Sequence, residues 1–171
     1  EVGETDCTNN AMRTCVTDAN GCRTWNSVSC PAAHQCDNTS GLCAAAASNN
    51  DTCANAQPLT FYGDKAIAVG DTTNANSTTR GTCHGDGAKD RVYAFTLSTP
   101  RSVTVKATSF AYSGGLSVYI RKTCDSTSPL DEVVCAEILG WSWSNGEKTT
   151  TASAGYLAPG TYYVWIDGLG A

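Results

Sequence analysis

The distribution of cysteine constrains this chain more than any other feature of its sequence. Ten cysteines occur in 171 residues, and six of them fall between residues 7 and 43. The spacing contains none of the CxxC pairs that are typical of zinc sites. An even number of cysteines without metal-type spacing predicts complete pairing in five disulfides, which form in an oxidising, extracellular compartment. The ten positions are Cys7, Cys15, Cys22, Cys30, Cys36, Cys43, Cys53, Cys83, Cys124 and Cys135.

Cysteine density also divides the chain into two modules. We expect a disulfide-rich, loop-forming N-terminal module over residues 1–46 and a larger domain over residues 47–171, joined by the alanine- and asparagine-rich run at 44–50. A module of roughly 40 residues buries too little apolar surface to fold without cross-links. Within it we predict the pairings Cys7–Cys22, Cys15–Cys30 and Cys36–Cys43, the last because its two cysteines flank a short turn-forming loop.

The second module has the two-residue periodicity of β-strands. Apolar and polar side chains alternate over residues 91–97, 102–107 and 116–121, and residues 161–166 (Thr-Tyr-Tyr-Val-Trp-Ile) are rich in β-formers. Turn residues such as Pro100, Gly114 and Pro159 separate these runs. The pattern predicts half-buried antiparallel strands and therefore an all-β chain whose main domain is an antiparallel β-sandwich.

Four stretches of the second module carry a family resemblance. They are Asn-Asp-Thr-Cys-Ala-Asn-Ala at 50–56, Gly-Asp-Thr-Thr at 70–73, the strand at 90–97, and Leu-Ala-Pro-Gly-Thr-Tyr-Tyr-Val-Trp-Ile-Asp-Gly at 157–168. From about residue 50 to 168 the chain resembles the bacterial pre-peptidase C-terminal domain, a jelly-roll-like β-sandwich of secreted and surface proteins. The resemblance implies two disulfides, Cys53–Cys83 and Cys124–Cys135. The first module more loosely resembles small cysteine-rich units of bacterial surface proteins.

The sequence contains few groups suited to catalysis. Its two histidines are His34 and His84, no G-x-S-x-G motif occurs, and fully paired cysteines leave no thiolate nucleophile. We therefore predict a protein that is not an enzyme.

Calcium is the metal that the loop residues favour. Ca²⁺ prefers carboxylate, carbonyl and amide oxygens, and relatives of the resembled family, the collagen-binding domains of bacterial collagenases, bind calcium near their N-terminal linker. We predict a calcium site formed by Asp51, Asp86 and Asp90. The alternative is that these side chains only stabilise turns.

Four aromatic residues form the predicted binding surface. Trp141 and Trp143 would share one face of a strand, as would Tyr163 and Trp165. Exposed aromatic rings suit sugar stacking or protein contact. The alternative is that the tryptophans belong to the core.

Charge and hydropathy limit the class of partner. The formal net charge is −5, with 11 basic and 16 acidic residues, which disfavours nucleic acid. No apolar run approaches the roughly 20 residues of a membrane helix. Since Glu1 is not an initiator residue, we expect a leader to have been removed. The expected partners are a protein or polysaccharide at the cell surface, or copies of this chain.

The C-terminus adds a further expectation. In the resembled family a final strand follows the Asp-Gly of the last motif, whereas only residues 169–171 follow Gly168 here. The chain is then a fragment, or its fold closes without that strand, or another chain donates one and a filament forms.

We predict a non-catalytic extracellular binding or assembly module. The alternative is an accessory domain or fragment of a secreted hydrolase such as a protease.

Overall fold

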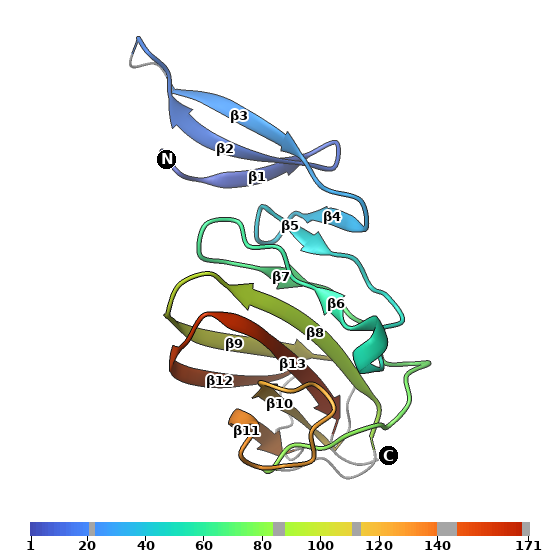
Figure 1. The fold of residues 1–171 in the computed structure, drawn as a ribbon. Coiled ribbons are helices and arrows are strands. Elements are labelled where there is room, and N and C mark those ends of the chain that lie inside the picture. The colour runs from blue at the N-terminus through green and yellow to red at the C-terminus, as the bar shows by residue number, and fades with distance from the viewer. Residues whose placement is uncertain (21–22, 84–87, 111–113, 140–146, 169–171) are drawn as a thin grey trace. The chain divides into compact units, whose positions relative to one another are not determined.

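A computed structural model describes residues 1–171 except 21–22, 84–87, 111–113, 140–146 and 169–171 (Figure 1). The chain is all-β, as predicted, and the one helical element described is the short 3-10 turn η1(Cys53–Asn55). No helix in the described residues has the length and apolar character needed to cross a membrane. The strands are β1(Thr5–Thr8), β2(Ala11–Thr17), β3(Arg23–Ser29), β4(His34–Asp37), β5(Leu42–Ala45), β6(Gln57–Pro58), β7(Ile67–Ala68), β8(Asp90–Leu97), β9(Arg101–Ser109), β10(Gly115–Arg121), β11(Glu132–Leu139), β12(Lys148–Leu157) and β13(Gly160–Gly168).

The chain forms two compact units that interleave in sequence. The first contains Glu1–Ala47 and Leu59–Gly70, and the second contains Ser48–Pro58 and Asp71–Ala171. The segment Leu59–Gly70, which the sequence places in the sandwich, belongs to the first unit because β7 pairs in parallel with β5.

The first unit is built of strands rather than loops. β1, β2 and β3 form one antiparallel sheet, while β4, β5 and β7 form a second. Asn9 and Asn10 make the two-residue turn between β1 and β2, both with positive φ, which is the conformation of a type I′ hairpin. Little apolar surface is buried here: every residue of β3 is exposed. The buried apolar residues of this unit are Cys15, Leu42, Cys43, Ala44 and Ala45.

The disulfides of the first unit differ from the predicted pairs. Cys7 bonds to Cys36 and Cys30 bonds to Cys43. Cys36 and Cys43 are indeed neighbours across β4 and β5. However, Cβ atoms of such neighbours lie about 4.5–5.5 Å apart, whereas a disulfide needs about 3.5–4.5 Å. Cys36 bonds instead to Cys7 on β1, and Cys43 bonds to Cys30, which directly follows β3.

Cys15 has no disulfide partner among the described cysteines. It is buried on β2, and its predicted partner Cys30 is taken by Cys43. Cys22, the predicted partner of Cys7, lies outside the described residues. The described part of the chain therefore contains four disulfides where five were expected, and none of the four has a predicted pairing.

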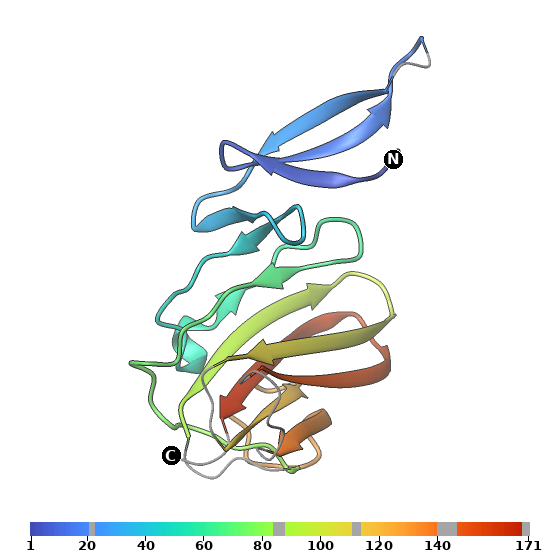
Figure 2. The same ribbon diagram turned by 180° about the vertical axis from the view of Figure 1, so that it is seen from behind.

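The second unit is an antiparallel β-sandwich, which confirms the predicted fold class. Its larger sheet has the strand order β11-β10-β13-β8-β6, and β9 pairs with β12 in a two-stranded sheet. The short β6 is parallel to β8, whereas the other pairs are antiparallel. β9 and β12 lie behind the larger sheet in Figure 1 and in front of it in Figure 2. The alternation predicted at 102–107 accounts for the packing of β9, which buries Ala107 while its alternate residues are exposed and polar, and β12 buries Ala152 and Ala154 in the same way.

The larger sheet is buried on both faces, which the sequence did not predict. All seven residues of β10 are buried, including Ser117, Tyr119 and Arg121. On the face away from the β9–β12 sheet, Val92, Tyr119 and Trp165 are side by side on three adjacent strands and form a core with Cys124. This second core means that β10 and β13 are central strands rather than half-buried ones.

Two disulfides join loop segments to this second core. Cys53 bonds to Cys124, and Cys83 bonds to Cys135, so the pairings implied by the family resemblance are both wrong. Cys124 lies three residues beyond the end of β10, whereas Cys135 is opposite Tyr119 in the middle of the β10–β11 pair. The bonds to Cys53 and Cys83 leave neither Cys124 nor Cys135 free to pair with the other.

The last described strand, β13, is not at a sheet edge. β13 lies between β10 and β8 and pairs with both. The larger sheet instead ends at β11 and β6, and among the described strands β9 and β12 each pair only with the other. The open edges of the second unit are therefore in its two-stranded sheet and at the two ends of the larger sheet.

Candidate functional site

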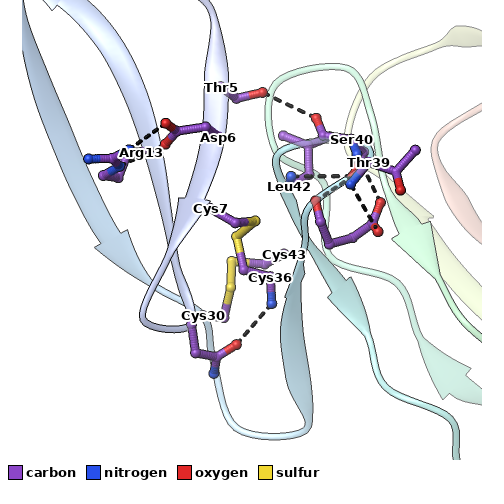
Figure 3. The surroundings of a disulfide bond; sticks show 12 residues. Thr5, Asp6, Cys7, Arg13, Cys30, Cys36, Thr39, Ser40, Leu42 and Cys43 are labelled. Atoms are coloured by element: carbon purple, nitrogen blue, oxygen red, sulfur yellow. Dashed lines mark hydrogen bonds and ion pairs between the residues drawn. A yellow bond between two sulfur atoms is a disulfide. The ribbon is translucent and has the colours of Figure 1, made fainter.

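A polar cleft of about 410 Å³ lies beside the Cys7–Cys36 disulfide in the first unit. Figure 3 shows this disulfide next to Cys30–Cys43, where the β1–β2 hairpin meets the β4–β5 hairpin. Most of the side chains that line the cleft are amides. The lining residues are Cys7, Thr8, Asn9, Asn10, Gln35, Cys36 and Asn38.

Asn10 holds one wall of the cleft against the other. Its side-chain Oδ1 accepts a hydrogen bond of 2.9 Å from the backbone N–H of Cys36 on β4. Its backbone carbonyl accepts a 3.0 Å hydrogen bond from the N–H of Cys30. Asparagine suits this position because it tolerates the positive φ of the turn. One residue thus fixes the hairpin tip relative to both disulfides.

The opposite wall is the β4–β5 turn, which Asp37 organises. Its carboxylate accepts hydrogen bonds from the backbone N–H groups of Thr39, at 3.3 Å, and Ser40, at 3.0 Å. The hydrogen bond with Ser40 is the main cause that lowers the pKa of Asp37. Gly41, with φ of 69°, closes the turn where a Cβ would collide with the backbone of Thr5. The Asp37 hydrogen bonds and the glycine at position 41 therefore stabilise this turn.

Three amide side chains of the cleft have no partner. Asn9, Gln35 and Asn38 are exposed, and their side chains form no hydrogen bond with any other described residue. Each primary amide offers two N–H donors and a carbonyl acceptor. No charged side chain is among the seven described lining residues. The cleft therefore presents neutral hydrogen-bonding groups on a cross-linked frame.

A second polar cluster lies in the second unit and contains two of the predicted calcium ligands. Asp51 and Asp90 are both buried, at 5% and 0% exposure. The Asp90 carboxylate accepts hydrogen bonds from the N–H groups of Thr78, at 2.8 Å, and Thr79, at 3.0 Å. Asp51 accepts one of 2.7 Å from the side chain of Asn76. The two aspartates thus anchor the loop that precedes β8.

Burial affects the two aspartates differently. Desolvation raises the pKa of Asp90, and the nearby charge of Asp51 raises it further. The hydrogen bonds from Thr78 and Thr79 lower this pKa but do not cancel the increase. For Asp51 desolvation is also the largest single contribution, yet hydrogen bonds, first that of Asn76, together lower its pKa. Asp90 is therefore the carboxyl group that is harder to ionise.

The predicted calcium site is only partly described. Asp86 lies outside the described residues, and no group of three histidine, cysteine or acidic side chains in the described part of the chain is arranged to hold a metal ion. In the structure Asp51 and Asp90 accept hydrogen bonds from a loop, which agrees with the alternative interpretation that these side chains stabilise turns. Calcium binding stays a prediction.

Trp165, one of the four residues of the predicted aromatic surface, is buried in a core. Trp165 is 2% exposed, stacks on Tyr119 at a centroid distance of 6.4 Å, and donates a 3.2 Å hydrogen bond from Nε1 to the carbonyl of Cys124. Tyr163 is half-buried and packs against the same core. The reason is that the loops held by the disulfides cover this face of β13. Trp141 and Trp143 lie outside the described residues.

A buried ion pair fixes the loop that carries Cys83. Arg121 lies 3.7 Å from Glu132 and 4.8 Å above the ring of Tyr119. Glu132 also accepts a hydrogen bond of 3.1 Å from the N–H of Thr82. Gly81 approaches Tyr119 and Cys135 so closely that a Cβ would clash with both. These contacts are structural and leave no exposed reactive group among them.

The two histidines give no catalytic arrangement that can be described. The Nδ1 of His34 lies 3.1 Å from the carbonyl of Ala32, and its Nε2 is buried without a hydrogen bond to the described residues. His84 lies outside them. The absence of enzymatic activity stays a prediction.

Comparison with protein families, curated proteins and solved structures finds no match to this chain. The likeness to the pre-peptidase C-terminal domain therefore rests on its four sequence stretches alone.

Sequence reasoning did not identify the amides of the cleft. Asn9 and Asn10 were detectable as a hairpin turn, because two asparagines between alternating residues favour a type I′ turn. Gln35 and Asn38 carry no local signal, and only the fold of the first unit brings them to the same cleft.

Proposed function

We propose that this protein is a non-catalytic extracellular binding module, and that the cleft of the first unit is its contact site. The observation that carries the proposal is the set of three unpartnered amides, Asn9, Gln35 and Asn38, around one cleft. Polar side chains that a fold holds rigidly in a concave site and leaves unpaired are available for a ligand.

The cross-links support an extracellular setting. Four disulfides are present in the described residues, and such bonds persist in oxidising compartments. The expected partner class is a surface protein or a polysaccharide.

Binding of the purified protein to a panel of polysaccharides and extracellular matrix proteins tests the proposal. We expect reversible binding to at least one member by biolayer interferometry, weakened by about tenfold or more when the three amides are removed. The same mixtures are assayed for new reducing ends and new peptide termini. Release of either product, or binding that ignores the three amides, contradicts the proposal.

Assembly with copies of this chain is the second candidate. It is favoured by the β9–β12 sheet, whose strands each pair with a single neighbour among the described strands and so present open edges. Light scattering over a range of protein concentrations tests it. A mass that rises with concentration is expected for strand addition, whereas a constant monomer mass excludes it.

A further inference from the structure

We propose that the ligand of the cleft beside the Cys7–Cys36 disulfide is a neutral polysaccharide, bound through the side-chain amides of Asn9, Gln35 and Asn38. This inference rests on the proposed binding function and assigns its ligand class.

Hydrogen-bonding capacity is the first argument. A sugar hydroxyl both donates and accepts, and a primary amide does the same through its N–H₂ and its carbonyl. Asn9, Gln35 and Asn38 place three such groups around one cleft, and none of them is used within the described structure. A chain of hydroxyl-bearing rings can satisfy all three amides at once.

The absence of charge in the lining is the second argument. The seven lining residues are amides, one threonine and a disulfide. A charged ligand entering this cleft would lose hydration without gaining an opposite charge. The site therefore favours a neutral polymer over nucleic acid, acidic polysaccharides or basic peptides.

The backbone of the cleft disfavours a peptide ligand. Peptides commonly bind by adding a strand to free backbone groups of a sheet edge. Here the N–H of Cys36 already donates to Asn10, and the N–H of Cys30 donates to the Asn10 carbonyl. The N–H of Cys36 is therefore already occupied, whereas the side-chain amides of Asn9, Gln35 and Asn38 have no partner in the described structure.

Rigidity and size agree with a short stretch of a polymer. Two disulfides, the Asn10 hydrogen bonds and the Asp37-capped turn hold the walls before a ligand arrives, which reduces the entropy lost on binding. The volume of about 410 Å³ falls at the lower end of ligand sites, which span about 300–1,000 Å³. An open cleft of this size accommodates part of a chain.

The test uses native affinity electrophoresis of the full chain through gels that contain laminarin, mannan, dextran or hydroxyethyl cellulose, with alginate as the charged comparison. The test variant is Asn9→Gly/Gln35→Ala/Asn38→Ala. Glycine is chosen at position 9 because its φ of 51° strains alanine but not glycine. The matched control is Asn26→Ala, which removes an exposed amide of β3 that does not line the cleft.

We expect at least one neutral polysaccharide to retard the wild type and the control. Retardation should be weakened by about tenfold or more in the triple variant. It should change little between about 0.05 and about 0.5 M salt, because no ion pair contributes. Thermal melts of the triple variant should match the wild type, which excludes misfolding as the cause.

Two results overturn the inference. One is that no neutral polysaccharide retards the wild type, and the other is that the triple variant is retarded as strongly as the wild type. If the protein panel described above shows amide-dependent binding while every neutral polysaccharide fails, the ligand class is wrong and the binding function stands. If neither panel shows amide-dependent binding, both proposals fall.

Discussion

The two units of this chain use disulfides for different purposes. In the first unit, Cys7–Cys36 and Cys30–Cys43 connect a region whose buried apolar side chains are few and mostly small, and one whole strand, β3, is exposed. In the second unit, Cys53–Cys124 and Cys83–Cys135 join loops to a sheet that already buries Trp165 and Tyr119. The cross-links replace a core in the first unit and cover one in the second.

The physical difference lies in what remains when the cross-links are broken. A disulfide contributes about 2–4 kcal/mol by restricting the unfolded chain, which is comparable with the whole stability of a small unit. We expect the larger sheet to keep its packing against β9 and β12, and its buried Val92, Tyr119 and Trp165, without its disulfides.

Trp165→Ala should cause the largest loss of stability in the second unit. Removing a fully buried tryptophan costs about 3–5 kcal/mol through the cavity that it leaves. Trp25→Ala is the control, because Trp25 is 42% exposed and surface substitutions usually cost less than about 1 kcal/mol. Urea denaturation followed by circular dichroism measures both. Equal costs would contradict the burial of Trp165 in a core.

Cys7→Ser/Cys36→Ser should unfold the first unit. The bond closes a loop with a sequence separation of 29, for which the chain-entropy estimate is about 3–4 kcal/mol, and little apolar burial compensates. Cys53→Ser/Cys124→Ser should leave β8, β10 and β13 folded, because their packing persists. Proton–nitrogen correlation spectra distinguish these results. A first unit that keeps its dispersed signals without Cys7–Cys36 would refute the contrast.

Asp90→Ala should destabilise the loop before β8 by about 1–3 kcal/mol, because it removes the charged acceptor of the hydrogen bonds from the N–H groups of Thr78 and Thr79. Asp90→Asn keeps a carbonyl acceptor and should cost less. Thermal melts at neutral pH compare the three proteins. If the asparagine variant loses as much as the alanine variant, the charge rather than the acceptor is what matters.

Acid should affect Asp37 and Asp90 in opposite directions. The pKa of Asp37 is lowered from its ordinary 3.8, so its contribution is present above that value and is lost as pH falls through the lower folded-state pKa. The pKa of Asp90 is raised, so its folded form takes up a proton first and gains relative stability as pH falls toward 3.8. Denaturation experiments from neutral pH to about pH 3 measure the unfolding free energy at each pH. The loss of stability in acid that comes from Asp37 should be absent in Asp37→Asn, and the gain that comes from Asp90 should be absent in Asp90→Asn. Unchanged dependences in both variants would contradict this assignment.

Local patterns predicted the strands but not their surroundings. The alternation at 91–97, 102–107 and 116–121 corresponds to β8, β9 and β10 because the side-chain period of a strand is a local property. The polar residues Ser117 and Arg121 suggested an exposed face of β10, yet Arg121 is buried because it pairs with Glu132. Exposure depends on which loops cover a sheet, and that is not encoded locally.

Pairing across long distances was the least predictable feature. Disulfide partners such as Cys53 and Cys124, separated by 71 residues, depend on which strands are adjacent and on their register. The same is true of Leu59–Gly70, which joins the first unit through β7, and of the cleft, whose amides come from two hairpins. A sequence specifies these neighbours only through the complete fold.

Hydrogen exchange measured by mass spectrometry before and after mild reduction tests the central claim most directly. After reduction of the four described disulfides, amides of β1, β2, β4 and β5 should lose protection, while those of β8, β10 and β13 should remain protected by the core around Trp165. Loss of protection in both units together, or retained protection in the reduced first unit, would contradict the conclusion that disulfides replace a core in one unit and supplement it in the other.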